Sequence, residues 1–169
     1  MAVTAFLFPG QGSQVVGMAS ILAQNSKIAK DILSEIDDAL DFKLSALMAE
    51  GPKEDLQLTQ NAQPALFTSS ICTLRVLQNQ TGKTIHELCS YVAGHSLGEY
   101  SALCAAGSLG ISETARLLHL RGQSMQQAVP VGEGAMAALI GADLAIAEEI
   151  ASASADAGLV QIANDNADG

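Results

Sequence analysis

The sequence has 169 residues, of which 49% are apolar and 15% are charged, so it encodes a folded globular chain rather than a disordered one. Its net charge of −10, with eight Lys and Arg residues, argues against binding to nucleic acid or to an anionic membrane surface. The cysteines Cys72, Cys89 and Cys104 show neither metal-ligand nor disulfide spacing, so we expect buried thiols, no metal site and a cytoplasmic location.

The N-terminal third predicts one buried strand followed by helices. Residues 3–8 form an apolar run that is typical of a strand buried on both faces of a parallel sheet, and a glycine-rich loop over residues 10–14 follows it. Ser26 is the expected N-cap of a helix whose apolar residues recur every four positions up to Leu40. Shorter helices are expected around residues 16–23 and 43–49.

The middle of the chain predicts two further helices. Residues 53–63 are polar and are interpreted as a loop. Pro64 then suits the first turn of a helix that runs to about residue 80, because a first-turn residue needs no backbone N–H. Another helix is expected to start at Ser112 and to end before Pro130.

Between these helices, residues 94–98 read Gly-His-Ser-Leu-Gly. A short apolar run precedes them and a segment rich in helix formers follows, which is the strand–turn–helix context of a Gly-x-Ser-x-Gly nucleophile elbow. Such a turn exposes the hydroxyl of Ser96 and points the N–H groups of the next helix at a developing oxyanion. The alternative is a glycine-rich turn with an incidental serine, which the flanking segments disfavour.

Arg121 lies on a predicted apolar helix face, because Leu117, Leu118 and Met125 are three or four residues away from it. A guanidinium in that position needs a partner, and its planar fork suits a carboxylate. The commoner role for such an arginine is structural pairing or extension of the charged end to solvent. The residues alone therefore leave both roles open.

The composition changes after residue 130. Residues 134–141 and 159–163 are predicted strands on either side of an alanine-rich helix over residues 144–154. A β-α-β unit alone cannot bury both sheet faces and both edges, so we expect the chain to be part of a longer protein. We predict two partial domains, over residues 1–128 and 129–169.

Several separated segments together resemble the malonyl-CoA:acyl carrier protein transacylases of bacterial fatty-acid synthesis. They are residues 8–14 (FPGQGSQ), 63–66 (QPAL), 94–103 (GHSLGEYSAL), 121–126 (RGQSMQ) and 134–138 (GAMAA). The resemblance implies an α/β-hydrolase-like acyltransferase core that holds the first half of an inserted ferredoxin-like small domain. It also implies transfer of a malonyl group from coenzyme A to the phosphopantetheine thiol of acyl carrier protein through an acyl-serine, with malonyl-CoA as substrate and no further cofactor.

The same resemblance assigns the catalytic roles. It makes Ser96 the nucleophile, and it assigns the oxyanion hole to the backbone N–H groups of Gln11 and Leu97. A serine hydroxyl attacks poorly by itself and needs a base within hydrogen-bond reach. The glycines on either side of Gln11 allow its backbone to approach the acyl group.

The resemblance also implies the substrate contacts. It predicts that Arg121 binds the malonyl carboxylate and that Gln63 orients Arg121, although a helix-start role for Gln63 is the alternative. His95 is a further candidate at the substrate site, but its position next to Ser96 favours structural support.

The catalytic histidine of the family has no counterpart among His86, His95 and His119, and we expect it beyond residue 169. We therefore expect the chain alone to be nearly inactive and prone to association through an unpaired strand edge. Two alternatives remain: an α/β-hydrolase-type serine esterase or thioesterase, and a non-catalytic fragment that binds coenzyme A or a partner. An arginine in the acyl pocket disfavours an esterase for neutral acids, whereas the missing histidine favours the fragment.

Overall fold

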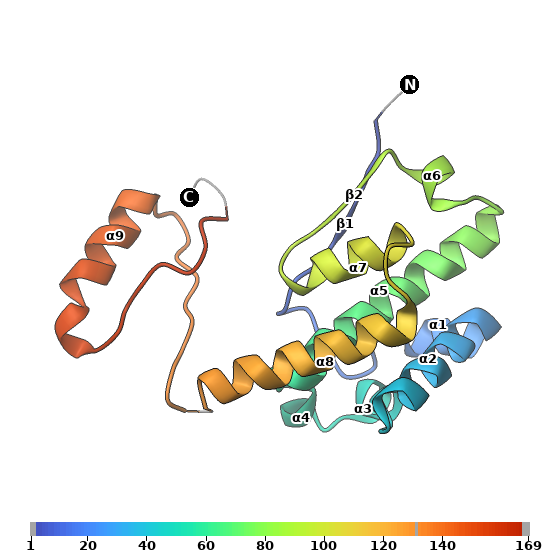
Figure 1. The fold of residues 1–169 in the computed structure, drawn as a ribbon, viewed down its shortest axis with the longest axis horizontal. Coiled ribbons are helices and arrows are strands. Elements are labelled where there is room, and N and C mark those ends of the chain that lie inside the picture. The colour runs from blue at the N-terminus through green and yellow to red at the C-terminus, as the bar shows by residue number, and fades with distance from the viewer. Residues whose placement is uncertain (1–2, 131, 167–169) are drawn as a thin grey trace. The chain divides into compact units, whose positions relative to one another are not determined.

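Two short parallel strands carry the segment that leads to Ser96 (Figure 1). The computed structural model describes residues 3–130 and 132–166. Strand β1 (Ala5–Phe8) pairs in parallel with β2 (Tyr91–Gly94), in a register that places Phe8 opposite Gly94. Because helices separate the two parallel strands in the sequence, the structure confirms the predicted α/β class.

Helices make up most of the chain between residues 20 and 157 (Figure 1). They are α1 (Ser20–Asn25), α2 (Lys27–Leu40), α3 (Leu44–Glu50), α4 (Lys53–Gln57), α5 (Thr59–Thr81), α6 (Ile85–Leu88), α7 (Leu97–Ala105), α8 (Ile111–Ala128), α9 (Leu144–Ala153) and the short 3₁₀ helix η1 (Ala155–Ala157). The two longest, α5 and α8, pack against each other, and α2 and α7 pack against both. None of the helices in the described part of the chain combines the length and the apolarity that crossing a bilayer requires.

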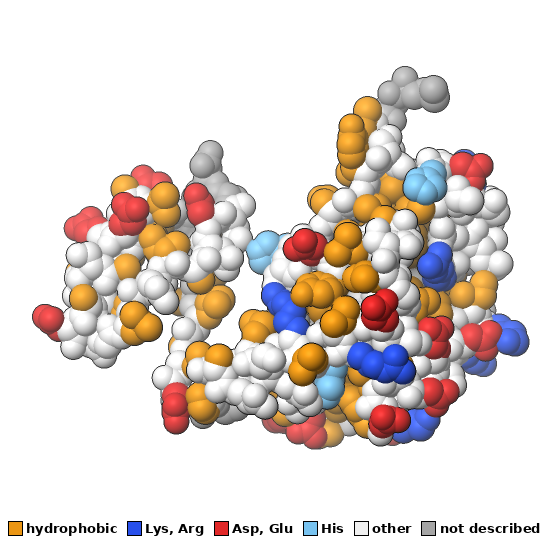
Figure 2. All heavy atoms as spheres, in the orientation of Figure 1, with side chains coloured by type: hydrophobic (Ala, Val, Ile, Leu, Met, Phe, Trp, Pro, Cys, Tyr) orange, Lys and Arg blue, Asp and Glu red, His pale blue; other side chains and the backbone are white. Residues whose placement is uncertain are grey.

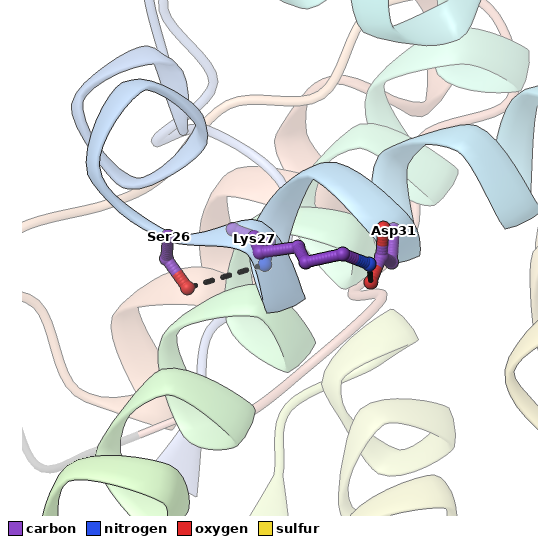
Figure 3. Close-up of polar contacts among 4 residues, drawn as sticks. Ser26, Lys27 and Asp31 are labelled. Atoms are coloured by element: carbon purple, nitrogen blue, oxygen red, sulfur yellow. Dashed lines mark hydrogen bonds and ion pairs between the residues drawn. The ribbon is translucent and has the colours of Figure 1, made fainter.

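Ser26 caps α2, as the sequence predicts (Figure 3). Its backbone is extended, and its hydroxyl oxygen accepts a hydrogen bond from the N–H of Ala29 at 3.4 Å. In the first turn, the Lys27 ammonium contacts the Asp31 carboxylate at 2.6 Å, an exposed pair that contributes only about 0.3–0.5 kcal/mol. The cap fixes where α2 begins.

The core of the first unit lies where α5 meets α2 and α8. Phe67 and Ile71 of α5, Ile36 of α2 and Leu118 of α8 are almost completely buried there. Cys72 is buried in the same cluster, and burial raises the pKa of its thiol to about 12. The three cysteines are free and buried, as predicted.

Two N-terminal elements differ from the sequence-based expectation. The strand spans residues 5–8 rather than 3–8, and it is not buried on both faces, because the side chain of Leu7 is 77% exposed. β1 and β2 pair only with each other among the described residues, so no further strand extends the sheet there. Helix α1 begins at Ser20 rather than near residue 16, because Gly17 and Ala19 adopt positive φ angles of 94° and 62° that a helix does not allow.

The prediction of a loop over residues 53–63 was wrong. These residues form α4 and the first turn of α5, so Pro64 is inside α5 rather than in its first turn. A proline there removes the backbone hydrogen bond that residue 64 would donate to the carbonyl of Gln60. Tertiary packing compensates for this loss, because the segment from Asn61 to Thr68 is buried.

Contacts between residues group the chain into two compact units, Met1–Val131 and Gly132–Gly169. All eight Lys and Arg residues belong to the first unit, whereas acidic side chains occur in both (Figure 2). In the second unit α9 forms as predicted, and the Asp143 carboxylate caps it by accepting from the N–H of Ile146 at 2.9 Å.

The two strands predicted in the second unit do not form. Residues 134–139 and 159–163 are irregular. A strand requires a neighbouring strand as hydrogen-bond partner, and these two segments do not pair with each other. Apolar side chains in these segments remain exposed, with Met136 at 79% and Leu159 at 89%. The sequence end at residue 169 lies outside the described residues.

Candidate active site

Ser96 occupies a tight turn between β2 and α7. Its backbone has φ 54° and ψ −114°, a positive-φ conformation that is unfavourable for a residue with a side chain. The turn is held by two hydrogen bonds, from the N–H of Gly98 to the carbonyl of His95 at 2.9 Å and from the N–H of Glu99 to the carbonyl of Ser96 at 3.1 Å. The side chain of Ser96 is exposed, so this strand–turn–helix geometry is that of a nucleophile elbow.

The two glycines of the motif are required by close backbone contacts. A Cβ at Gly94 would overlap the carbonyl of Gly98, so any side chain there would push β2 away from α7. A Cβ at Gly98 would overlap the carbonyl oxygen of Phe8 at the end of β1. Only glycine allows β1, β2 and α7 to approach this closely.

The loop after β1 lies against the elbow. A Cβ at Gly10 would be 2.7 Å from Nδ1 of His95, so the loop backbone is in contact with the His95 side chain. The next residue, Gln11, donates from Nε2 to the Thr59 hydroxyl at 3.4 Å. Leu97 is the first residue of α7, where helix geometry leaves backbone N–H groups without partners inside the helix. The contact with Gly10 favours structural support by His95, and this role stays a prediction.

Arg121 connects α8 to the elbow. Its Nη1 donates to Oε1 of Gln63 at 2.6 Å, and its Nη2 donates to Oγ of Ser96 at 3.0 Å. The guanidinium carbon lies 5.9 Å from the centroid of the Tyr100 ring, within the range of a cation–π interaction. The structure therefore brings together three residues that are far apart in the sequence: Ser96, Gln63 and Arg121.

The charge of Arg121 has only neutral partners in these contacts. The ion pairs of the described residues are Lys27–Asp31 and Lys43–Asp37, and neither involves Arg121. Gln63 is fully buried, and its Nε2 donates to the sulfur of Met125 at 3.3 Å, which leaves Oε1 to accept from the guanidinium. A half-buried cation without a carboxylate partner among the described ion pairs, beside an exposed hydroxyl, can accept an anionic group as a further partner.

Two residues at this site were not identified from the sequence. The Tyr100 ring on α7 lies near the Arg121 guanidinium, and its position four residues after Ser96 was the available signal. Gly122 is buried in α8, and a Cβ there would overlap Cα of Gln60 in the first turn of α5. A glycine inside a helix costs stability, so its presence indicated a close helix–helix contact.

No hydrogen bond found among the described residues joins His86 or His119 to Ser96. His119 bonds through Nδ1 to the carbonyl of Gln60 and through Nε2 to the side chain of Gln123. His86 belongs to the short helix α6 and is exposed. Among residues 3–130 and 132–166, no group of three or more His, Cys, Asp or Glu side chains could hold a metal ion.

The fold and this site define a class of protein. The chain belongs to the acyl transferase domain family, whose model matches residues 5–168. It is 46% identical, over 170 residues and its whole length, to a malonyl CoA-acyl carrier protein transacylase of Bacillus subtilis, and it covers 52% of that protein.

Solved structures agree with this assignment. The acyl-carrier-protein-S-malonyltransferase from Bartonella henselae matches 98% of the chain with 53% identity and a TM-score of 0.91, over 52% of its own chain. A malonyl-transacylase in complex with a type II PKS acyl-carrier protein matches 92% of the chain with 42% identity and a TM-score of 0.83, over 49% of its own chain. The chain thus spans about half the length of the relatives it matches.

Proposed function

We propose that the protein is a malonyl-CoA:acyl carrier protein transacylase, in which Ser96 carries the malonyl group between two thiols. The observation that supports this most directly is the pair formed by the Ser96 hydroxyl and the Arg121 guanidinium at 3.0 Å. A nucleophile beside a cation without a carboxylate partner suits an acyl group that ends in a carboxylate. Acetyl groups lack the charge that Arg121 would bind.

The proposed reaction has two halves. Oγ of Ser96 attacks the thioester carbonyl carbon, and the backbone N–H groups of Gln11 and Leu97 stabilise the resulting oxyanion. The C–S bond then breaks, coenzyme A leaves as its thiol, and the malonyl group remains as an ester on Ser96. In the second half the phosphopantetheine thiol of acyl carrier protein attacks that ester, and Ser96 regains its proton.

Arg121 and Gln63 have separate tasks in this proposal. The carboxylate of the malonyl group would replace Ser96 Oγ as an acceptor of the Arg121 N–H groups, which frees the hydroxyl for attack. Gln63 would hold Arg121 in place through the 2.6 Å hydrogen bond while this exchange occurs. His119 is engaged by Gln60 and Gln123, so it is not proposed as the base that accepts the Ser96 proton. That base is proposed to lie in the part of the relatives' length that the chain does not span.

The finer architecture is also a proposal. Residues 1–128 would form part of an α/β-hydrolase-like core, and residues 129–169 would begin a ferredoxin-like small domain. The break between units at Val131 and Gly132 supports this division. The three buried free thiols support a reducing, cytoplasmic setting.

A partition assay tests the function. Because the chain spans about half the length of its relatives, activity is measured on the longest form of the protein that contains it. That protein is incubated with malonyl-CoA, with and without acyl carrier protein that bears phosphopantetheine. We expect malonyl-acyl carrier protein to form, and little free malonate to appear when the acceptor is omitted, since a transferase must exclude water from its acyl-enzyme.

The rival functions give different results in the same assay. Continuous release of free malonate at a rate that acyl carrier protein does not change would identify a thioesterase. Binding of malonyl-CoA without release of coenzyme A would identify a non-catalytic fragment. Either result would overturn the proposed transferase.

A further inference from the structure

The carbonyl of Gln60 is left without its usual helical partner. In α5 the N–H of residue 64 would normally donate to this oxygen, but residue 64 is proline and has no N–H. A carbonyl in this half-buried position needs another donor. Nδ1 of His119, on α8, lies 2.9 Å from it.

Two neighbours fix the imidazole of His119 in this role. A carbonyl oxygen can only accept, so Nδ1 carries a proton and donates to Gln60. The amide Nε2 of Gln123 lies 3.0 Å from the other ring nitrogen and donates to it. The Phe42 ring packs against the imidazole with centroids 5.3 Å apart. The ring is therefore held on three sides in one tautomer.

This contact lies about one helical turn from the Gln63–Arg121 pair on α5 and about half a turn from it on α8. Gln60 precedes Gln63 by three residues on α5, and His119 precedes Arg121 by two residues on α8. Gly122 brings the two backbones together at the same level, because a Cβ there would overlap Cα of Gln60. The His119–Gln60 bond therefore joins α5 and α8 close to the place where Gln63 contacts Arg121.

We propose that His119 is a positioning residue for acyl selection, which acts by holding the first turn of α5 against α8 so that Gln63 keeps Arg121 aimed at Ser96. This proposal rests on the proposed function. His119 contacts neither Ser96 nor Arg121 through any described hydrogen bond, so its effect is indirect. Without the cross-helix bond, Gln63 and Arg121 would lose their fixed spacing, and a carboxylate would be bound less well than the rest of the acyl group.

The test compares three variants by their kcat/KM for malonyl-CoA and for acetyl-CoA. His119→Leu removes the donor, His119→Asn retains an N–H donor near the position of Nδ1, and His86→Ala alters an exposed histidine outside the site. We expect His119→Leu to reduce the malonyl-to-acetyl ratio about 10- to 100-fold, mainly through KM for malonyl-CoA, because small displacements in a positioned site have effects of this size. His119→Asn should restore most of the ratio, and His86→Ala should not change it.

Gln123→Ala keeps the test decisive if His119→Leu does not fold. It leaves the donor in place but releases the ring, so we expect a smaller loss of the ratio, about threefold to tenfold. Equal losses for malonyl and acetyl transfer in His119→Leu, or an unchanged ratio in both His119→Leu and Gln123→Ala, would overturn the proposal.

A second readout separates this proposal from the proposed function. The NMR resonance of the Arg121 side-chain Nε–H is recorded in the wild-type protein and in the variants, without substrate. We expect it to shift in His119→Leu and to return toward its wild-type position in His119→Asn. If the wild-type protein transfers no malonyl group, the function fails, but the shift still tests the positioning role. An unchanged Arg121 resonance in His119→Leu would contradict that role directly.

Discussion

Replacing Arg121 with alanine is expected to reduce malonyl transfer at least about 30-fold while leaving acetyl transfer nearly unchanged. The guanidinium donates to Gln63 and Ser96 and has no carboxylate partner among the described ion pairs. A substrate carboxylate would therefore form an ion pair with Arg121 without displacing a protein carboxylate. Loss of one member of a desolvated charged pair costs about 2–5 kcal/mol, which corresponds to about 30-fold to several thousand-fold in rate. The measurement is the ratio of kcat/KM for malonyl-CoA and acetyl-CoA.

Two further variants sharpen this experiment. Arg121→Lys keeps the charge but loses the planar fork, so an intermediate ratio is expected. Arg116→Ala is the matched control: this arginine is also on α8, but it donates from Nε to the carbonyl of Ala39 at 3.0 Å, away from the elbow. Equal losses of malonyl and acetyl transfer in Arg121→Ala would show that Arg121 is structural rather than selective.

The Gly98→Ala substitution is expected to destabilise the protein by more than about 3 kcal/mol, because the new Cβ would overlap the carbonyl oxygen of Phe8. Gly98 belongs to α7 and Phe8 is the last residue of β1. Neither can move without shifting the helix or the strand. Any shift of Phe8 also moves the following loop with Gln11, and acyl transfer should fall with stability. Urea denaturation gives the change in the free energy of unfolding.

Gly110→Ala is the control for this substitution. Gly110 precedes α8, has an ordinary φ of −76°, and has no atom within 4 Å of an added Cβ, so the change should cost less than about 1 kcal/mol. If Gly98→Ala and Gly110→Ala unfolded at the same urea concentration, the close approach of β1 and α7 would be wrong.

The elbow was predictable from the sequence because its geometry depends on residues that are adjacent in the chain. Gly94, Ser96 and Gly98 fall within five consecutive positions, and the flanking apolar run and helix formers specify strand and helix. The Ser26 cap was predictable for the same reason. Local sequence determines local backbone geometry in both cases.

The helical start of α5 and the irregular segments of the second unit were not predictable in this way. Burial and the His119–Gln60 contact compensate for the hydrogen bond that Pro64 removes inside α5, and that contact joins residues far apart in the sequence. Residues 134–139 and 159–163 have strand-like composition, but a strand needs a partner that composition does not specify. The contact between Tyr100 and Arg121 likewise depends on how α7 and α8 pack.

The most direct test of the central proposal is to locate the acyl group on the protein. After incubation with malonyl-CoA and no acceptor, the protein is digested and its peptides are analysed by mass spectrometry. We predict a malonyl ester on Ser96 that is absent from Ser96→Ala. It should persist in Ser101→Ala, since Ser101 is buried on α7 and its hydroxyl has no hydrogen-bond partner. A malonyl adduct that survives Ser96→Ala would contradict the assignment of Ser96 as the nucleophile.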